Sequence, residues 1–193
     1  MNLISSPGAG KTTIVARSIK ELEARGKASA ALIGDQQTSR DADRIRDTGA
    51  QALQINTGKG CHLDAHMVGH AAENLGLAEN STLFIENVGN LVCPAGFDLG
   101  EHKRVVMLSV TEGEDKPLKY PTAILSSQLL LINKIDLLEH VDFDIEACER
   151  YAREKNPDIR IIRLSARTGE GFDEWVRWLE EAGAPETASA AAV

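Results

Sequence analysis

Residues 5–12 constrain the fold of this chain more than any other segment, and their sequence is SSPGAGKT. A short apolar run, residues 2–5, precedes the segment, and a helical pattern over residues 11–25 follows it. Gly8 and Gly10 let the backbone wrap closely around a phosphate, with its N–H groups pointing inward. The following helix adds its positive N-terminal end. The segment therefore predicts a phosphate-binding loop between a strand and a helix.

Two side chains at the end of this loop have the chemistry that a nucleoside triphosphate requires. Lys11 supplies a cation for the β- and γ-phosphates, and the hydroxyl of Thr12 is placed to bind Mg²⁺. The motif usually opens with glycine, and Ser5 takes that place here. The alternative, a glycine-rich helix N-terminus without a ligand, is disfavoured by the intact strand–loop–helix context. The nucleotide-binding residues expected in this segment are Pro7, Gly8, Ala9, Gly10, Lys11, Thr12 and Thr13.

The rest of the chain alternates short apolar runs with longer amphipathic segments, which is typical of a parallel sheet covered by helices. We expect an α/β fold, a three-layer P-loop NTPase with a mostly parallel sheet flanked by helices. A single domain should span residues 1–181, followed by a flexible C-terminal tail, residues 182–193. The predicted strands are residues 2–5, 30–33, 52–55, 82–86, 104–108, 129–132 and 159–164, and the predicted helices are 11–25, 63–75, 144–155 and 171–181.

Composition excludes several classes of protein. The chain of 193 residues carries a net charge of −8, which opposes a nucleic-acid-binding surface. No apolar run approaches the ~20 residues of a membrane-spanning helix, and no signal peptide is visible. Three cysteines cannot form a full disulfide framework, and Cys148 occupies a core-facing helical position. We expect a cytoplasmic protein that binds neither nucleic acid nor membranes, with reduced thiols available as metal ligands.

A guanine-binding segment follows the buried strand at residues 129–132, with the sequence NKID. In GTPases the aspartate of such a segment accepts two hydrogen bonds from guanine, a donor pair that adenine lacks. The asparagine braces the loop, and the lysine stem covers the base. The run SAR after the last strand is placed to offer a backbone N–H to the guanine O6. The alternative interpretation of the NKID segment is a surface turn after a core strand. The expected base-binding residues are Asn133, Lys134, Asp136, Ser165, Ala166 and Arg167.

A group of cysteine and histidine residues has the chemistry of a transition-metal site. Cys61 and His62 are adjacent, and His66 and His70 follow at four-residue spacing, which predicts that the three histidines share one helical face. Cys93 lies on the loop after another strand, and loops at one sheet edge converge. Thiolate and imidazole suit Zn²⁺ or Ni²⁺ better than Mg²⁺. On spacing alone, a buried cysteine and surface histidines without metal remain an equal alternative.

The sequence closely resembles the nickel-incorporation GTPases of hydrogenase maturation, the HypB family. The resemblance is carried by residues 5–12, 57–65, 86–95, 111–121 and 133–136, and it covers residues 2 to about 181. The Cys-His and Val-Cys-Pro segments separate this family from its urease-accessory relatives.

The resemblance implies a GTP-regulated homodimer that works with a nickel-handling accessory protein. It would deliver Ni²⁺ to the precursor of a [NiFe]-hydrogenase large subunit. The metal ligands it implies are Cys61, His62 and Cys93, with Zn²⁺ or Ni²⁺ shared across the dimer, and His66 and His70 form a weaker accessory site. Family members often carry an N-terminal nickel-binding extension. Because the first strand follows Met1 directly, we expect only the site of the GTPase domain here.

Carboxylates at strand ends are the expected partners of Mg²⁺ and of the attacking water. Asp35 ends the second strand and Glu86 the fourth. Asp41 is a further metal candidate, for which a helix-capping or solvated carboxylate is the alternative. Gly89, three residues after Glu86, is expected to sense the γ-phosphate. The predicted catalytic residues are Lys11, Asp35 and Gly89, and the predicted magnesium ligands are Thr12, Asp35, Asp41 and Glu86.

The short distance in sequence between Gly89 and Cys93 predicts coupling between the two sites. A γ-phosphate that pulls on Gly89 would move Cys93 and so reshape the metal site. Three other functions compete with this one. They are a metal-storage dimer gated by nucleotide, a urease-type nickel chaperone, and an ATP-using kinase of similar fold, against which the NKID segment argues.

Overall fold

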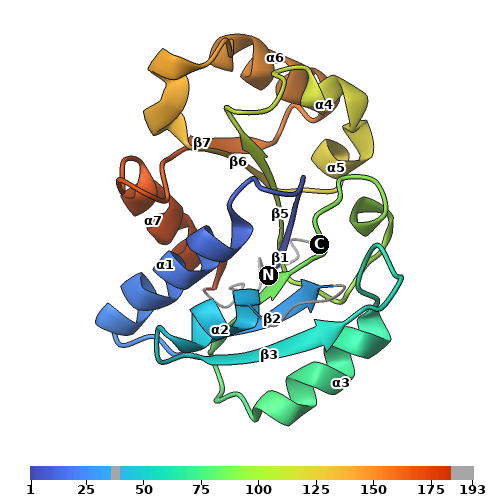
Figure 1. The fold of residues 1–193 in the computed structure, drawn as a ribbon, viewed down its shortest axis with the longest axis vertical. Helices are drawn as coiled ribbons and strands as arrows, with labels where there is room; N and C mark the ends of the chain where they lie inside the picture. Colours follow the sequence, from blue (N-terminus) through green and yellow to red (C-terminus); the bar gives the residue numbers. More distant parts are fainter. Residues whose placement is uncertain (36–39, 184–193) are drawn as a thin grey trace, which may run out of the picture.

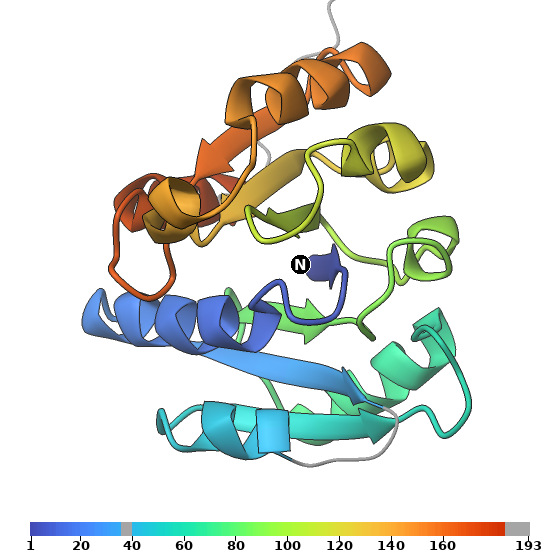
Figure 2. The same cartoon turned by 45° about the horizontal axis from the view of Figure 1, so that its top comes forward.

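The computed structural model describes residues 1–35 and 40–183, and its centre is a seven-stranded sheet in which every strand pair is parallel. Helices cover both faces of the sheet (Figures 1 and 2). The predicted α/β fold is thus confirmed, with a sheet that is parallel throughout. The order is β3-β2-β4-β1-β5-β6-β7, for β1 (Asn2–Ser5), β2 (Ser29–Asp35), β3 (Gln51–Asn56), β4 (Thr82–Glu86), β5 (Arg104–Ser109), β6 (Leu129–Asn133) and β7 (Arg160–Arg163).

The helices divide between the two faces, with α1, α2 and α7 on one side and α3, α5 and α6 on the other (Figure 2). None of the helices in the described ranges is long and apolar enough to cross a membrane. The predicted tail lies, from residue 184 onward, outside the described residues. The helices are α1 (Lys11–Ala24), α2 (Arg40–Arg46), α3 (Ala65–Leu75), α4 (Lys116–Lys119), α5 (Pro121–Leu125), α6 (Ile145–Lys155) and α7 (Phe172–Ala182), with 3₁₀ turns η1 (Pro94–Gly96) and η2 (Ile135–His140).

Alternation along the strands explains how both faces become buried. Leu3 belongs to a buried apolar cluster that also holds residues of α1, α2 and α7, whereas Ile4, the next residue on β1, belongs to a second cluster that holds residues of α5 and α6. Successive side chains of a strand point to opposite faces, so a strand covered on both sides must be apolar throughout. Cys148 is fully buried in the second of these clusters, where burial raises the pKa of its thiol to about 12. It is a packing residue, as the sequence predicts.

The helix boundaries follow from local capping. Gly26, with φ of 71°, takes the left-handed conformation that ends α1, and its N–H donates to the carbonyl of Glu23. Asp64 caps α3 by accepting a hydrogen bond from the N–H of Met67 at 2.8 Å. The helix therefore begins at Ala65. The prediction that His62 shares a helical face with the two later histidines is wrong, because it precedes the cap.

The parallel arrangement gathers the polar strand ends at one edge of the sheet. Strands β1, β2, β4 and β6 end there at Ser5, Asp35, Glu86 and Asn133 respectively. The carboxyl edge of an open α/β sheet is where such folds bind ligands. All the predicted nucleotide-binding segments therefore lie together, although they are far apart in sequence.

Candidate functional site

The phosphate-binding loop leads from β1 into α1 and lines a cavity of about 470 Å³. Gly10, with φ of 101°, precedes the helix and tolerates no side chain, because a Cβ there would lie 2.6 Å from Nδ2 of Asn133. Lys11 points back across the loop, and its Nζ donates to Oγ of Ser5 at 2.8 Å. Burial lowers the pKa of Lys11, and the nearby carboxylates of Glu86 and Asp41 oppose that effect. Ser5 thus fills the place of the usual glycine by holding the loop lysine.

The predicted magnesium ligands converge on the same cavity. Oγ1 of Thr12 donates to Oε1 of Glu86 at 2.8 Å, and Oε2 of Glu86 has no hydrogen-bond partner among the described residues. Burial raises the pKa of Glu86 to about 7. Asp35 and Asp41 line the cavity from β2 and α2. A buried carboxylate with an unsatisfied oxygen, a hydroxyl and two more carboxylates form an oxygen-rich donor set that fits Mg²⁺.

Two further residues shape the phosphate end of this cavity. Gly89 packs against the phosphate loop so closely that a Cβ would lie 3.1 Å from Cα of Pro7. Sequence reasoning missed Arg44, which lies on α2, lines the cavity and donates to Oγ1 of Thr13 at 3.2 Å. Arg44 lies in a short, mostly polar helix, and no sequence motif marks it as a nucleotide-binding residue. The cavity is thus lined by cationic side chains, Lys11 and Arg44 among them, as well as by the acidic groups.

A second cavity, of about 440 Å³, adjoins the first and has the residues predicted for guanine. Nδ2 of Asn133 donates to the carbonyl of Ala9 at 2.8 Å, and its Oδ1 accepts from the N–H of Ala166 at 3.1 Å. The asparagine therefore ties the loop after β7 to the phosphate loop. Lys134 lines both cavities, and its Nζ reaches the carbonyl of Gly8 at 2.8 Å. The lining comprises Gly10, Thr13, Asn133, Lys134, Asp136, Leu137, Ser165, Ala166 and Arg167.

Asp136 is held as an ionised acceptor in this cavity. Oγ of Ser165 donates to its Oδ1 at 2.6 Å, and Nε of Arg167 contacts its Oδ2 at 3.0 Å. The hydrogen bond from Ser165, reinforced by the Arg167 guanidinium, lowers the pKa of the carboxyl group. An ionised carboxylate only accepts hydrogen bonds, so it favours a base that presents two donors side by side.

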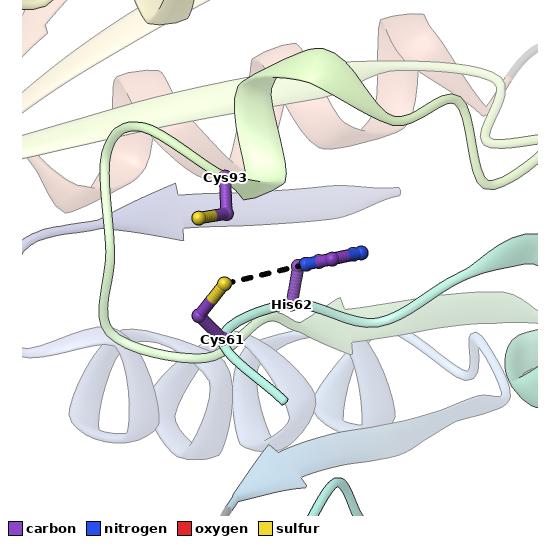
Figure 3. A group of neighbouring side chains, drawn as sticks. All are labelled: Cys61, His62 and Cys93. Atoms are coloured by element: carbon purple, nitrogen blue, oxygen red, sulfur yellow. Dashed lines mark hydrogen bonds between the residues drawn. The ribbon is translucent and has the colours of Figure 1, made fainter. Parts of the chain in front are cut away.

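The thiol and imidazole groups of Cys61, His62 and Cys93 form a compact cluster (Figure 3). Their ligand atoms all lie within 4.8 Å of one another, and Sγ of Cys61 lies 3.5 Å from Nδ1 of His62. The hydrogen bond with the Cys93 thiol raises the pKa of Cys61. The ring of Phe97, a residue that sequence reasoning missed, stacks on His62 with a centroid distance of 3.8 Å. A soft donor set of this kind suits Zn²⁺ or Ni²⁺.

The two later histidines lie apart from this cluster. His66 and His70 are exposed on α3, with their rings stacked at a centroid distance of 6.5 Å. Nδ1 of His70 lies 3.8 Å from a carboxylate oxygen of Glu73. In the described ranges the compact donor group comprises the two cysteines and His62 only. Any accessory role of the helical pair is therefore separate from the main cluster.

One loop after β4 contacts both sites. Gly89 touches the phosphate loop, while Asn90 donates through Nδ2 to the carbonyl of Cys61 at 3.4 Å. The buried Asn87 accepts the N–H of Leu63 at 3.1 Å, just after His62 in sequence. Sequence reasoning missed both asparagines, although they fall inside the segment that also carries Cys93. Residues 87–93 thus connect the nucleotide cavity directly to the thiol cluster.

Comparison with known proteins agrees with this arrangement. Residues 1–163 match the model of the nucleotide-binding domain shared by CobW, HypB and UreG. The chain belongs to the CobW/HypB/UreG family. Within the family it is 63% identical, over 93% of its length, to the hydrogenase maturation factor HypB of Azotobacter vinelandii. The chain spans 59% of the length of that relative.

Solved structures place the fold close to HypB proteins. HypB of Helicobacter pylori, whose crystal structure contains nickel, superposes with a TM-score of 0.88 at 38% identity, covering 94% of this chain and 85% of that one. HypB of Archaeoglobus fulgidus superposes with a TM-score of 0.87 at 41% identity, covering 95% and 89% of the two chains. This family membership supports a nucleotide-binding role for the two cavities at the sheet edge.

Proposed function

We propose that the protein binds and hydrolyses GTP and uses the nucleotide state to deliver nickel during [NiFe]-hydrogenase maturation. The observation that carries the proposal is the loop of residues 87–93, which contacts the phosphate loop at Gly89 and the metal cluster at Asn90 and Cys93. The nearby HypB relatives, one solved with nickel, support the same cargo. The GTPase domain would span residues 1–181.

In the proposed reaction the chain positions the triphosphate and its attacking water. Lys11 neutralises charge on the β- and γ-phosphates, Gly89 approaches the γ-phosphate, and Asp35 orients the water. Thr12, Glu86 and the carboxylates of Asp35 and Asp41 would hold Mg²⁺, which supplies charge neutralisation at the phosphates. Phosphoryl transfer depends on positioning and electrostatics, and these residues provide both.

In the base cavity, guanine would be selected over adenine by Asp136. Its carboxylate would accept hydrogen bonds from N1–H and the exocyclic amine, while a backbone N–H of the loop at residues 165–167 would donate to O6. The low pKa of Asp136 keeps the acceptor ionised at neutral pH. Adenine lacks this donor pair and would leave the carboxylate unsatisfied.

For the metal cargo, we propose Cys61, His62 and Cys93 as ligands of Ni²⁺ or Zn²⁺. Three protein ligands leave one tetrahedral position open, and a second copy of the chain or water would complete it. If a second copy of the chain supplies the fourth ligand, the protein forms a homodimer that depends on nucleotide and metal. His66 and His70, which lie separately on α3, form the weaker accessory site. We place the protein in the cytoplasm, with a nickel-handling accessory protein and the hydrogenase large-subunit precursor as partners.

The test is calorimetric titration of Ni²⁺ and of Zn²⁺, in GDP and in a non-hydrolysable GTP analogue, with sedimentation of the same samples. We expect metal affinity and dimerisation to differ between the two nucleotide states, and the difference to disappear in Cys93→Ala. Cys148→Ala is the matched control, because it removes a thiol that is buried in the core and is not part of the metal-ligand group. Identical metal binding in both states would refute the coupling, since a ligand without differential affinity shifts no equilibrium.

A further inference from the structure

Arg17 reaches from the phosphate-binding helix into the base-binding loop. It lies on α1, and its Nη1 donates to the carbonyl of Ala166 at 3.0 Å and to that of Arg167 at 3.5 Å. Its guanidinium also lies over the ring of Phe172, the first residue of α7, at 4.8 Å from the centroid. One side chain thus contacts consecutive carbonyls of the loop and the helix that follows it.

The loop is built around this guanidinium. Residues 165–171 close on themselves, with the N–H of Ser165 donating to the carbonyl of Glu170 at 2.9 Å. Gly169 has a φ of 93°, which favours glycine, and a Cβ there would meet the guanidinium of Arg17. The planar guanidinium can donate to two carbonyls while stacking on an aromatic ring, which a lysine ammonium cannot do.

The same loop carries half of the proposed base recognition. Ser165 orders Asp136, and the N–H of Ala166 is fixed by Asn133, so these contacts tie the loop to β6 and its following turn. The contacts of Arg17 tie its carbonyl side to α1, whose first residues line the phosphate cavity. Two sets of contacts therefore hold the loop. The contacts of Ser165 and Ala166 attach it to Asp136 and Asn133, and those of Arg17 attach its backbone carbonyls to α1.

We infer that Arg17 is a positioning residue for guanine: it sets the base-binding loop at the distance from α1 at which a backbone N–H of the loop can donate to O6. The inference rests on the proposed guanine-binding function and deepens it. Arg17 does not contact Asp136 in the described structure, so recognition of the 2-amino group should not depend on it. The two halves of base recognition should therefore separate in an Arg17 variant.

The experiment compares GDP with two analogues by competition binding. In 6-thioguanosine diphosphate a poorly accepting sulfur replaces O6, and inosine diphosphate lacks the 2-amino group. For Arg17→Ala we expect GDP affinity to fall about tenfold, the size of one lost hydrogen bond. Its preference for GDP over the 6-thio analogue should fall to nearly one. Its preference for GDP over inosine diphosphate should equal that of the wild type.

Two further variants test whether the effect comes from the hydrogen bonds of Arg17. Arg17→Lys keeps the charge and stem but not the double donation, so it should fold and still lose most of the O6 preference. Arg25→Ala removes a charge at the end of the same helix, where Arg25 pairs with Glu180 at 3.2 Å, and should leave both preferences intact. Unchanged O6 preference in both Arg17 variants, or equal loss of both preferences, overturns the inference. A wild type that does not prefer GDP to ADP overturns the guanine-binding function itself.

Discussion

The buried carboxylate of Glu86 should make the nucleotide-free protein lose stability as the pH rises. Glu86 is 5% exposed, with Oε2 unpartnered among the described residues, and burial raises its pKa from 4.5 to about 7. A carboxyl group with a raised pKa binds a proton more tightly in the folded state. Its contribution to stability is therefore complete below about pH 4.5 and is lost as the pH rises through about 7.

The size of this effect follows from the shift. At about 1.4 kcal/mol per pH unit, a pKa raised from 4.5 to about 7 amounts to about 3 kcal/mol of unfolding free energy. Glu86→Gln removes the charge and keeps an oxygen that can accept from Thr12. From about pH 5.5 to about pH 8, the wild type should therefore lose about 2 kcal/mol relative to this variant.

Urea unfolding of the nucleotide-free protein in a chelator, across this pH range, measures the difference. Titrations common to both proteins cancel when the two curves are subtracted. Glu154→Gln, which removes an exposed carboxylate on α6, is the control and should run parallel to the wild type. Parallel curves for wild type and Glu86→Gln would show that the carboxylate is not destabilised by burial. In the same variant, Mg²⁺ should no longer increase GDP affinity, because the ionised ligand is missing.

Two other changes test the base cavity and the metal cluster. Asp136→Asn should lower GDP affinity about 100-fold or more, because charge-assisted hydrogen bonds contribute about 1.5–3 kcal/mol each. It should raise affinity for xanthosine diphosphate, whose 2-oxo group accepts from the new amide; competition binding measures both, and an unchanged base preference would contradict the role. Phe97→Ala removes the stacked ring from His62 and should weaken Zn²⁺ binding about threefold to tenfold, in line with aromatic stacking of about 0.5–1.5 kcal/mol. Calorimetric titration measures this loss, and equal Zn²⁺ affinity would show that the ring does not orient the ligand.

Sequence reasoning located the segments that are short and contiguous, and the structure places them around two adjoining cavities. The phosphate loop, the NKID segment and the SAR run each require a fixed local order of residues, so their spacing is visible in the chain. Strands covered on both faces show near-continuous apolar character, so the parallel sheet was also predictable. The pairing of Cys61, His62 and Cys93 rested on the family resemblance, because spacing alone left it open, and the structure brings their ligand atoms together.

Other features depend on contacts between segments far apart in sequence. The helix cap at Asp64 separates His62 from the later histidines and leaves it to stack on Phe97. Arg17 and Arg44 carry no motif, and their partners lie on other elements.

The sequence by itself therefore determined the fold class, the phosphate-binding loop and the placement of the NKID and SAR segments after two strands of the sheet. Each of these is encoded in local order or in strand periodicity. Only the tertiary structure decided that Asn87 and Asn90 link β4 to the thiol cluster, and that Glu86 is buried enough for its pKa to reach about 7. The physical reason is that burial and long-range hydrogen bonds depend on how the sheet brings distant strand ends together, which no local pattern records.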